Sequence, residues 1–259
     1  MRTVISADST AIAYDELGDG PPIILIGGAF NDRRTTAPLA AALSDGFTVL
    51  NADRRGRGDS GDHAEYAVQR EVEDLDALIA ATGGSAAVFG YSSGAMLVLE
   101  AAAAGSSITR LALYEPPFIV DASRRAPAAD LAERVRTLVA DDRRGDAVEL
   151  FQLEAVGLPE EVVVRMRHAP FRPGLEAIAQ TLAYEAELTG DASLPADLAA
   201  AVTAPTLVLA GAESPAFFHT GAAALVDALP AGRLQTLPGQ THDLDPEPTA
   251  AAIAAFLAG

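Results

Sequence analysis

The sequence predicts an α/β protein with a mostly parallel sheet and helices on both faces. Short apolar runs typical of buried strands alternate with segments of helical periodicity in residues 1–119, and this alternation returns in residues 204–259. Between them, residues 120–203 carry helical patterns broken by Pro and Gly, with no convincing buried strand. We therefore expect a core of residues 1–119 and 204–259 that carries residues 120–203 as a helical cap.

The expected strands form a hairpin followed by six further strands, of which Ile23–Ile26 is a continuous apolar run suited to burial on both faces. Thr3–Ser6 and Ala11–Tyr14 flank the turn residues Asp8–Thr10 and predict the hairpin. The remaining strands are Ile23–Ile26, Phe47–Leu50, Ala86–Phe89, Leu111–Tyr114, Thr206–Leu209 and Arg233–Leu237. Because parallel sheets bind ligands at the carboxyl ends of their strands, residues that directly follow these strands are the candidates for chemistry.

The expected helices lie between these strands and fill the cap. Apolar residues recur at helical spacing in each of them. In chain order they are 35–44, Tyr66–Ala80, Ser92–Ala104, then Glu133–Val139, Ala147–Val156, Pro159–His168 and Leu175–Leu188 in the cap, and finally 220–228 and Pro248–Leu257.

Composition excludes several classes of function. The 259 residues carry 18 basic and 36 acidic side chains, a net charge of −18, and all of the basic residues are arginine. Phosphate binding needs clustered positive charge, so we expect no nucleic-acid or membrane partner. The absence of cysteine rules out disulfides, thiolate metal ligands and a thiol nucleophile. With no signal-like start and no apolar stretch long enough to span a bilayer, a cytoplasmic location is expected.

A candidate nucleophile lies in Gly90-Tyr91-Ser92-Ser93-Gly94, which matches G-x-S-x-G between an expected strand and an expected helix. That context is the one in which a nucleophile elbow forms, with the serine on a sharp turn and small residues two positions either side. The helix start beneath it favours developing negative charge. We therefore predict Ser92 as the nucleophile.

A serine nucleophile needs a base, and the chain has four histidines. His242 follows the last expected strand, which places it at the same sheet edge as Ser92. It also fits the chain order of nucleophile, acid and then histidine. His63, His168 and His219 are better explained as structural or surface residues. We predict His242 as the general base.

With these motifs the chain resembles the α/β-hydrolase fold family over nearly its whole length. The resemblance is carried by Ile26–Phe30, Asp53–Ser60, Gly90–Gly94, Pro205–Gly211 and Gly239–His242. It implies that the backbone N–H groups of Ala29 and Ser93 form an oxyanion hole. Similar proteins usually have histidine where Gly27 stands here.

The catalytic acid departs from the family pattern. Its usual position, three residues past Gly211, is occupied by Ser214, which cannot hold a carboxylate charge. Glu115, directly after the strand that follows the nucleophile helix, is similar to the arrangement in certain haloalkane dehalogenases and is our choice. Glu213 is the alternative acid, and a triad lacking both carboxylates is the third possibility. Dehalogenation itself is not expected, because those enzymes use Asp as the nucleophile.

These residues predict a serine hydrolase, a monomer or homodimer, that cleaves a small, largely apolar ester, lactone or thioester without a metal or other cofactor. A cofactor-free lyase or isomerase, or a non-catalytic small-molecule binding protein, are the alternatives on this fold. We expect the substrate pocket to be lined by Phe30, Asn31, Tyr91 and Phe118. Other aromatic residues that could line an apolar pocket under the cap are Phe151, Phe171, Tyr184, Phe217 and Phe218.

Overall fold

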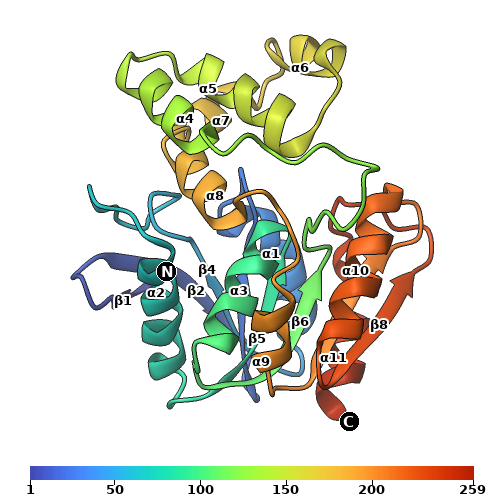
Figure 1. The fold of residues 1–259 in the computed structure, drawn as a ribbon. Coiled ribbons are helices and arrows are strands. Elements are labelled where there is room, and N and C mark those ends of the chain that lie inside the picture. The colour runs from blue at the N-terminus through green and yellow to red at the C-terminus, as the bar shows by residue number, and fades with distance from the viewer.

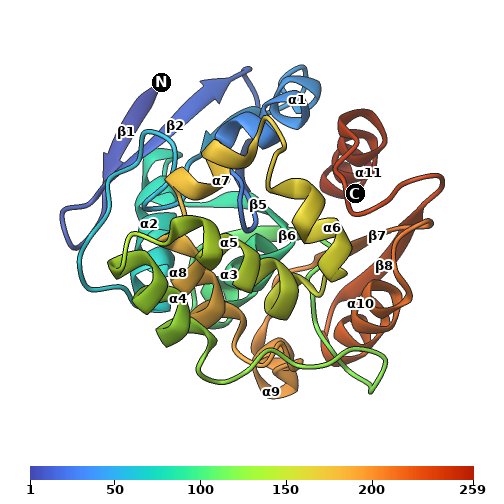
Figure 2. The same ribbon diagram turned by 90° about the horizontal axis from the view of Figure 1, so that it is seen from above.

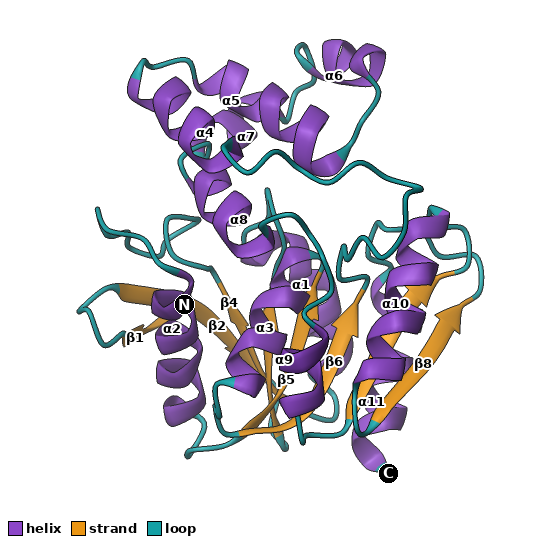
Figure 3. Cartoon of the chain, viewed as in Figure 1, coloured by secondary structure: helices purple, strands orange, loops and turns teal.

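The computed structural model describes residues 1–259 and contains one eight-stranded sheet of order β1-β2-β4-β3-β5-β6-β7-β8. The β1–β2 and β2–β4 pairs are antiparallel and all other pairs are parallel. The α/β class expected from the sequence is therefore confirmed (Figure 3). The strands are β1 (Arg2–Ile5), β2 (Ala11–Leu17), β3 (Pro22–Ile26), β4 (Thr48–Ala52), β5 (Ala86–Tyr91), β6 (Ile108–Tyr114), β7 (Thr206–Gly211) and β8 (Gly232–Leu237).

Helices cover both faces of the sheet. The helices outside the inserted segment are α1 (Arg33–Leu43), α2 (Val68–Ala81), α3 (Ser93–Ala103), α10 (Ala216–Ala228) and α11 (Pro246–Ala258). Figure 2 shows α1 and α11 on one side of the sheet, and α2, α3 and α10 on the other. The β3 strand explains why both faces are filled: Ile24 and Ile26 belong to one apolar cluster, whereas Ile23 and Leu25 belong to the other.

The segment between β6 and β7 is helical, and most of it lies beyond the carboxyl ends of the strands (Figure 1). It contains α4 (Leu131–Ala140), α5 (Arg144–Phe151), the π-helical turn η1 (Gln152–Val156), α6 (Glu160–Met166), α7 (Arg172–Ala177), α8 (Thr181–Thr189) and α9 (Ala196–Ala201). Residues of α4, α5 and α8 form a separate apolar cluster that includes Val135, Val148 and Leu182. In contrast, α9 packs against α3 and α10.

Several expected helices have different bounds in the structure. The single helix expected over Leu175–Leu188 is two helices in the structure, α7 and α8, because turns at Ala179 and Thr181 interrupt it. Ala179 and Leu182 are nevertheless both buried in the apolar cluster of the insert. The helix expected over Ala147–Val156 changes to π-helical geometry after Phe151. The α9 helix was not expected. No helix combines the length and the apolar character that crossing a bilayer requires.

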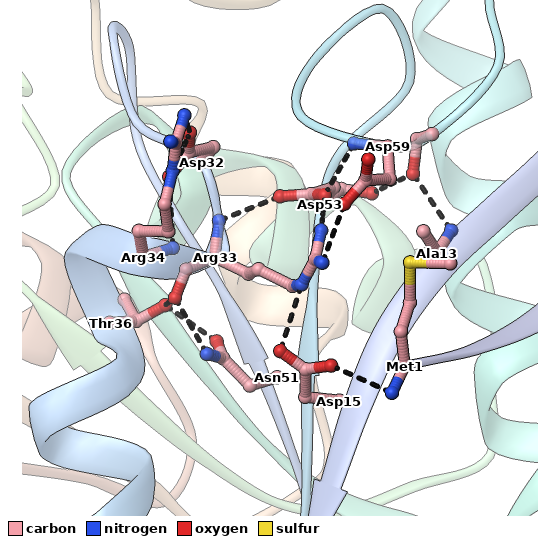
Figure 4. A network of polar contacts seen from close by, with 11 residues as sticks. Met1, Ala13, Asp15, Asp32, Arg33, Arg34, Thr36, Asn51, Asp53 and Asp59 are labelled. Atoms are coloured by element: carbon pink, nitrogen blue, oxygen red, sulfur yellow. Dashed lines mark hydrogen bonds and ion pairs between the residues drawn. The ribbon is translucent and has the colours of Figure 1, made fainter.

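A buried carboxylate fixes the loops that precede α1 and follow β4 (Figure 4). Asp53 is fully buried and accepts hydrogen bonds from the backbone N–H groups of Arg33 (2.7 Å) and Asp59 (2.9 Å). The Arg33 guanidinium forms ion pairs with Asp53, with Asp59 (2.6 Å) and with Asp15 (2.9 Å). The start of α1, directly after the Gly27–Asn31 loop, is thereby tied to the loop that follows β4.

Candidate active site

Ser92 occupies a sharp turn between β5 and α3. Its backbone angles are φ 55° and ψ −124°, a conformation that costs free energy for a residue with a Cβ. The neighbouring chain leaves no room for larger residues. A Cβ at Gly90 would lie 2.5 Å from Cα of Ala95, and one at Gly94 would lie 2.5 Å from the carbonyl oxygen of Gly27. The strand–turn–helix expected from the G-x-S-x-G motif is therefore present.

Two backbone donors lie beside this turn. Ser93 is the first residue of α3, so its N–H has no acceptor within the helix. The N–H of Ala29, in the loop after β3, also donates to no protein acceptor. Gly28 packs directly on the serine, since a Cβ at Gly28 would lie 2.8 Å from Cβ of Ser92. The structure thus brings Ala29 and Ser93 to the nucleophile candidate with free N–H groups.

Glu115 is hydrogen-bonded to His242, as predicted. Oε2 of Glu115 lies 2.7 Å from Nδ1 of His242, and Oε1 accepts a hydrogen bond of 2.7 Å from the backbone N–H of Gly211. Glu115 is completely buried and has a φ of 48°. Glu213 is exposed, and only its backbone is held, by the carbonyl of Gln240. Ser214, at the usual acid position, is buried and its hydroxyl has no hydrogen-bond partner.

Aromatic residues hold His242 in place. The Tyr91 hydroxyl donates to the His242 carbonyl (2.7 Å), and the Tyr114 hydroxyl donates to the Thr241 carbonyl (2.6 Å). Burial raises the pKa of both tyrosines, so both hydroxyls stay protonated and remain donors. The Phe218 ring stacks on the imidazole, with 4.4 Å between centroids and an interplanar angle of 14°. The imidazole is therefore fixed at its edge by Glu115 and on one face by Phe218.

Ser92 and His242 line the same cavity, of about 230 Å³, although no hydrogen bond joins their side chains. The other lining residues are predominantly apolar, and no aspartate or glutamate is among them. They are Ala29, Ser93, Pro117, Arg124, Pro127, Phe151, Ala155, Val156, Leu158, Thr189, Ala192, Pro215, Phe217 and Phe218. A cavity of this size and lining suits a small, largely apolar molecule.

The expected substrate pocket needs correction, because Phe30, Asn31, Tyr91 and Phe118 do not line this cavity. Phe30 packs edge-on against Phe151 instead, with 5.6 Å between ring centroids. Asn31 accepts a hydrogen bond from the Gly28 N–H (3.1 Å). Tyr91 and Phe118 are buried in the two core clusters on either face of the sheet. The four residues follow or end predicted strands, but this position in the chain does not determine the direction in which their side chains point.

The aromatic residues expected under the cap divide into two sets. Phe151, Phe217 and Phe218 line the cavity, as expected. Phe171 is exposed, and Tyr184 stacks on Tyr66 with 4.0 Å between ring centroids. Arg124 also lines the cavity and was not among the expected site residues. The only feature of the sequence that could have pointed to Arg124 is that it stands next to a second arginine, Arg125, in the segment between β6 and α4.

A buried ionic network connects α8 to the loop after β3. Arg57 donates to the carbonyl oxygen of Gly28 (2.8 Å) and pairs with Glu185 of α8. Arg54 pairs with Glu185 (2.6 Å) and with Glu71 (2.6 Å). Burial alone would raise the pKa of Glu71, but the charge of Arg54 holds that pKa below its usual value. These charges are almost completely removed from solvent, so each depends on its partners.

Comparison with known proteins agrees with this architecture. The model of the alpha/beta hydrolase family matches residues 23–255. The crystal structure of an alpha/beta hydrolase from Sphaerobacter thermophilus DSM 20745 is 49% identical, covers 99% of this chain and 100% of that one, and superposes with a TM-score of 0.93.

Two more distant proteins are also similar over most of their length. The 2-(acetamidomethylene)succinate hydrolase of Mesorhizobium japonicum is 28% identical over 93% of this chain and 90% of its own. An esterase from Rhodococcus sp. ECU1013 shares the fold, with a TM-score of 0.69 at 19% identity, over 100% of this chain and 98% of that one. Since the family model spans most of the chain, including strands β3 to β8, the insert and most of the helix after β8, the chain belongs to the α/β hydrolase family.

Proposed function

We propose that the protein is a serine hydrolase that cleaves a small, largely apolar ester, lactone or thioester through an acyl-enzyme on Ser92. The observation that carries this proposal is the convergence of three features on one cavity: Ser92 on its strained turn, His242 bonded to Glu115, and the free N–H groups of Ala29 and Ser93. Each corresponds to a part that acyl transfer needs.

In the proposed reaction, Oγ of Ser92 attacks the substrate carbonyl while Nε2 of His242 takes the hydroxyl proton. The same proton then passes to the leaving group, whose bond to the acyl carbon breaks. Glu115 keeps the His242 proton on Nδ1 and stabilises the imidazolium that forms. Water, deprotonated by His242, attacks the acyl-enzyme in the second half-reaction and releases the acid. Binding of substrate would bring Ser92 and His242 within hydrogen-bond distance, a contact that is often loose in free enzymes.

The negative charge of the tetrahedral intermediate would be held by the N–H groups of Ala29 and Ser93. Arg57 acts on the first of these donors through the peptide group that Gly28 and Ala29 share. In a trans peptide the C=O and N–H point in opposite directions. A carbonyl held by Arg57 therefore directs the Ala29 N–H away from the buried network, and the hydrogen bond polarises that N–H.

We also propose residues 120–203 as a cap over a catalytic core of residues 1–119 and 204–259. Phe151, Ala155 and Leu158 of this segment form part of the cavity wall. Because these residues are apolar, they would exclude water from the acyl-enzyme until the leaving group departs.

A fluorophosphonate probe and a p-nitrophenyl ester test the proposal together. The wild-type protein should be labelled at Ser92 in a one-to-one ratio. Ser92→Ala should lose labelling and at least about 10³-fold in turnover, because nucleophile and base act as a unit. Ser107→Ala is a matched control, since Ser107 is exposed and precedes β6 at the opposite end of the sheet. Full turnover by Ser92→Ala, or labelling elsewhere, contradicts the proposal and favours a lyase, isomerase or binding protein.

A further inference from the structure

The charges around the cavity are unusual for so acidic a chain. The protein carries 36 acidic side chains and a net charge of −18, yet no carboxylate lines the cavity. Its one permanently charged lining residue is Arg124. The cavity therefore offers a positive charge within an apolar wall.

Arg124 is held in place without being neutralised. One N–H of its guanidinium donates to the backbone carbonyl of Ala155, and the group lies over the ring of Phe217, 4.5 Å from the centroid. It forms no ion pair, unlike Arg54 and Arg57, which are paired with buried carboxylates. A guanidinium has five N–H donors, so four of those of Arg124 remain for another partner.

Partial burial makes this unpaired charge costly. Removal from water lowers the pKa of Arg124, and no carboxylate acts in the opposite direction. The group nevertheless stays protonated at neutral pH, because arginine titrates far above it. A partly buried cation without an anionic partner in the protein is a favourable site for an anionic ligand.

A second hollow, of about 480 Å³, is also lined by Arg124 and carries further arginines. Arg125 and Arg134 line it together with Arg124, and Glu154 is its one acidic residue. Glu154 is bonded to Arg134 at 2.7 Å, whereas Arg125 has no ion-pair partner. Asp130 also pairs with Arg134 (3.6 Å), so Arg124 and Arg125 are the two arginines of this hollow without an ion-pair partner, and their charges attract anions to this side of the cavity.

We propose that Arg124 binds a carboxylate of the substrate, so that the enzyme hydrolyses small acyl compounds that carry a negative charge at a distance from the scissile carbonyl. The inference rests on the proposed function, because it assumes that the reacting carbonyl lies at Ser92. The apolar wall would contact the carbon chain between the two ends. Arginine suits this task, since its planar fork matches the two oxygens of a carboxylate.

Paired esters test the proposal. We would compare kcat/KM for the monomethyl esters of malonic to adipic acid with that for methyl esters of neutral acids of matched length. At least one anionic ester should exceed its neutral partner tenfold or more, about 1.4 kcal/mol. In Arg124→Gln the ratio should fall at least tenfold, and Arg124→Lys should restore part of it. Arg143→Gln removes the same charge from an exposed part of the insert and should keep the wild-type ratio.

Several outcomes would overturn the inference. One is a wild-type enzyme that prefers the neutral ester in every pair. Another is an Arg124→Gln variant that slows both esters of a pair equally, because Arg124 would then only support Ala155 and Phe217 structurally. If neither ester is turned over and Ser92 resists the fluorophosphonate, the proposed function fails. Binding of the same monoesters to the Ser92→Ala protein, followed by NMR, still tests the arginine site. An affinity that Arg124→Gln in that background leaves unchanged would contradict it.

Discussion

Replacing Glu115 by glutamine changes one oxygen of a buried carboxylate into an NH₂ group and keeps the size of the side chain. Oε1 of the amide can still accept the hydrogen bond from the Gly211 N–H, which is 2.7 Å in the wild-type protein. The amide nitrogen then faces Nδ1 of His242, where Oε2 now lies at 2.7 Å. Because an NH₂ group only donates, Nδ1 must become an acceptor and the imidazole proton moves to Nε2.

The cost to catalysis follows from that tautomer. With its proton on Nε2, His242 cannot accept the proton of Ser92, and the buried negative charge that stabilises the imidazolium is lost. The equivalent Asp→Asn change in a Ser-His-Asp protease costs about 10⁴ in kcat, about 5.4 kcal/mol of activation free energy. The cost to stability is smaller, about 1–2 kcal/mol, since one charge-assisted hydrogen bond is weakened while the other keeps its geometry.

Steady-state hydrolysis of a p-nitrophenyl ester, together with thermal unfolding, measures both costs. We expect Glu115→Gln to lose about 10³- to 10⁴-fold in kcat with Tm lower by a few degrees. Glu213→Gln is the control, since Glu213 is exposed and makes no contact with His242, and it should change kcat less than twofold. If Glu115→Gln keeps more than a tenth of the wild-type kcat, or if both variants lose equally, the reasoning fails.

Two further predictions concern groups away from the reacting atoms. Arg57→Met should lower kcat tenfold or more with KM within about twofold. The Gly28 carbonyl loses its charged donor and keeps only the weaker hydrogen bond from the Asn31 N–H (3.3 Å), while the cavity wall keeps its residues. An equal effect on KM and kcat would indicate general disruption. Glu149→Gln should destabilise the protein by about 1 kcal/mol at neutral pH. Hydrogen bonds from Arg167 lower the folded-state pKa of Glu149, so its contribution is complete above the unfolded-state pKa of about 4.3 and disappears as the pH falls through the folded-state pKa. Unfolding free energies of wild type and variant should therefore converge in acid, and a gap that stays constant with pH would contradict the assignment.

The sequence was sufficient to place Ser92, Glu115 and His242 at one edge of the sheet. Each follows a predicted strand, and parallel strands bring their carboxyl ends together. The choice between Glu115 and Glu213 was harder, since both follow a strand. It depends on a turn in which the Ser214 N–H bonds to the Gly211 carbonyl at 3.1 Å, leaving Glu213 exposed to solvent. Periodicity does not report the direction of a side chain in a loop.

The cavity wall could not be predicted for a related reason. Phe30 and Phe118 occupy the expected positions in the chain, but Phe30 packs behind the lining residue Phe151 and Phe118 packs in a core cluster, so neither lines the cavity. The lining residues Phe151 and Arg124 lie in the insert, where the arrangement of short helices depends on contacts between elements distant in sequence. The spacing of apolar residues identifies such helices, but it does not show which residues of each helix contact the cavity.

The order of elements along the chain has a consequence for protein engineering. Tyr91 and Tyr114 are paired in the register of β5 and β6, so Ser92 and Glu115 are set side by side before the chain enters the insert. A transplanted insert from another hydrolase would leave that spacing intact and change only what covers it. The insert also has to supply the contacts that it makes with the core, such as the packing of α9 against α3 and α10. One further contact is a carboxylate where Glu185 stands, because without it Arg57 would have no ion-pair partner in the interior. Of two chimaeras that differ only at this position, the one that lacks the carboxylate should be less stable by about 3–5 kcal/mol.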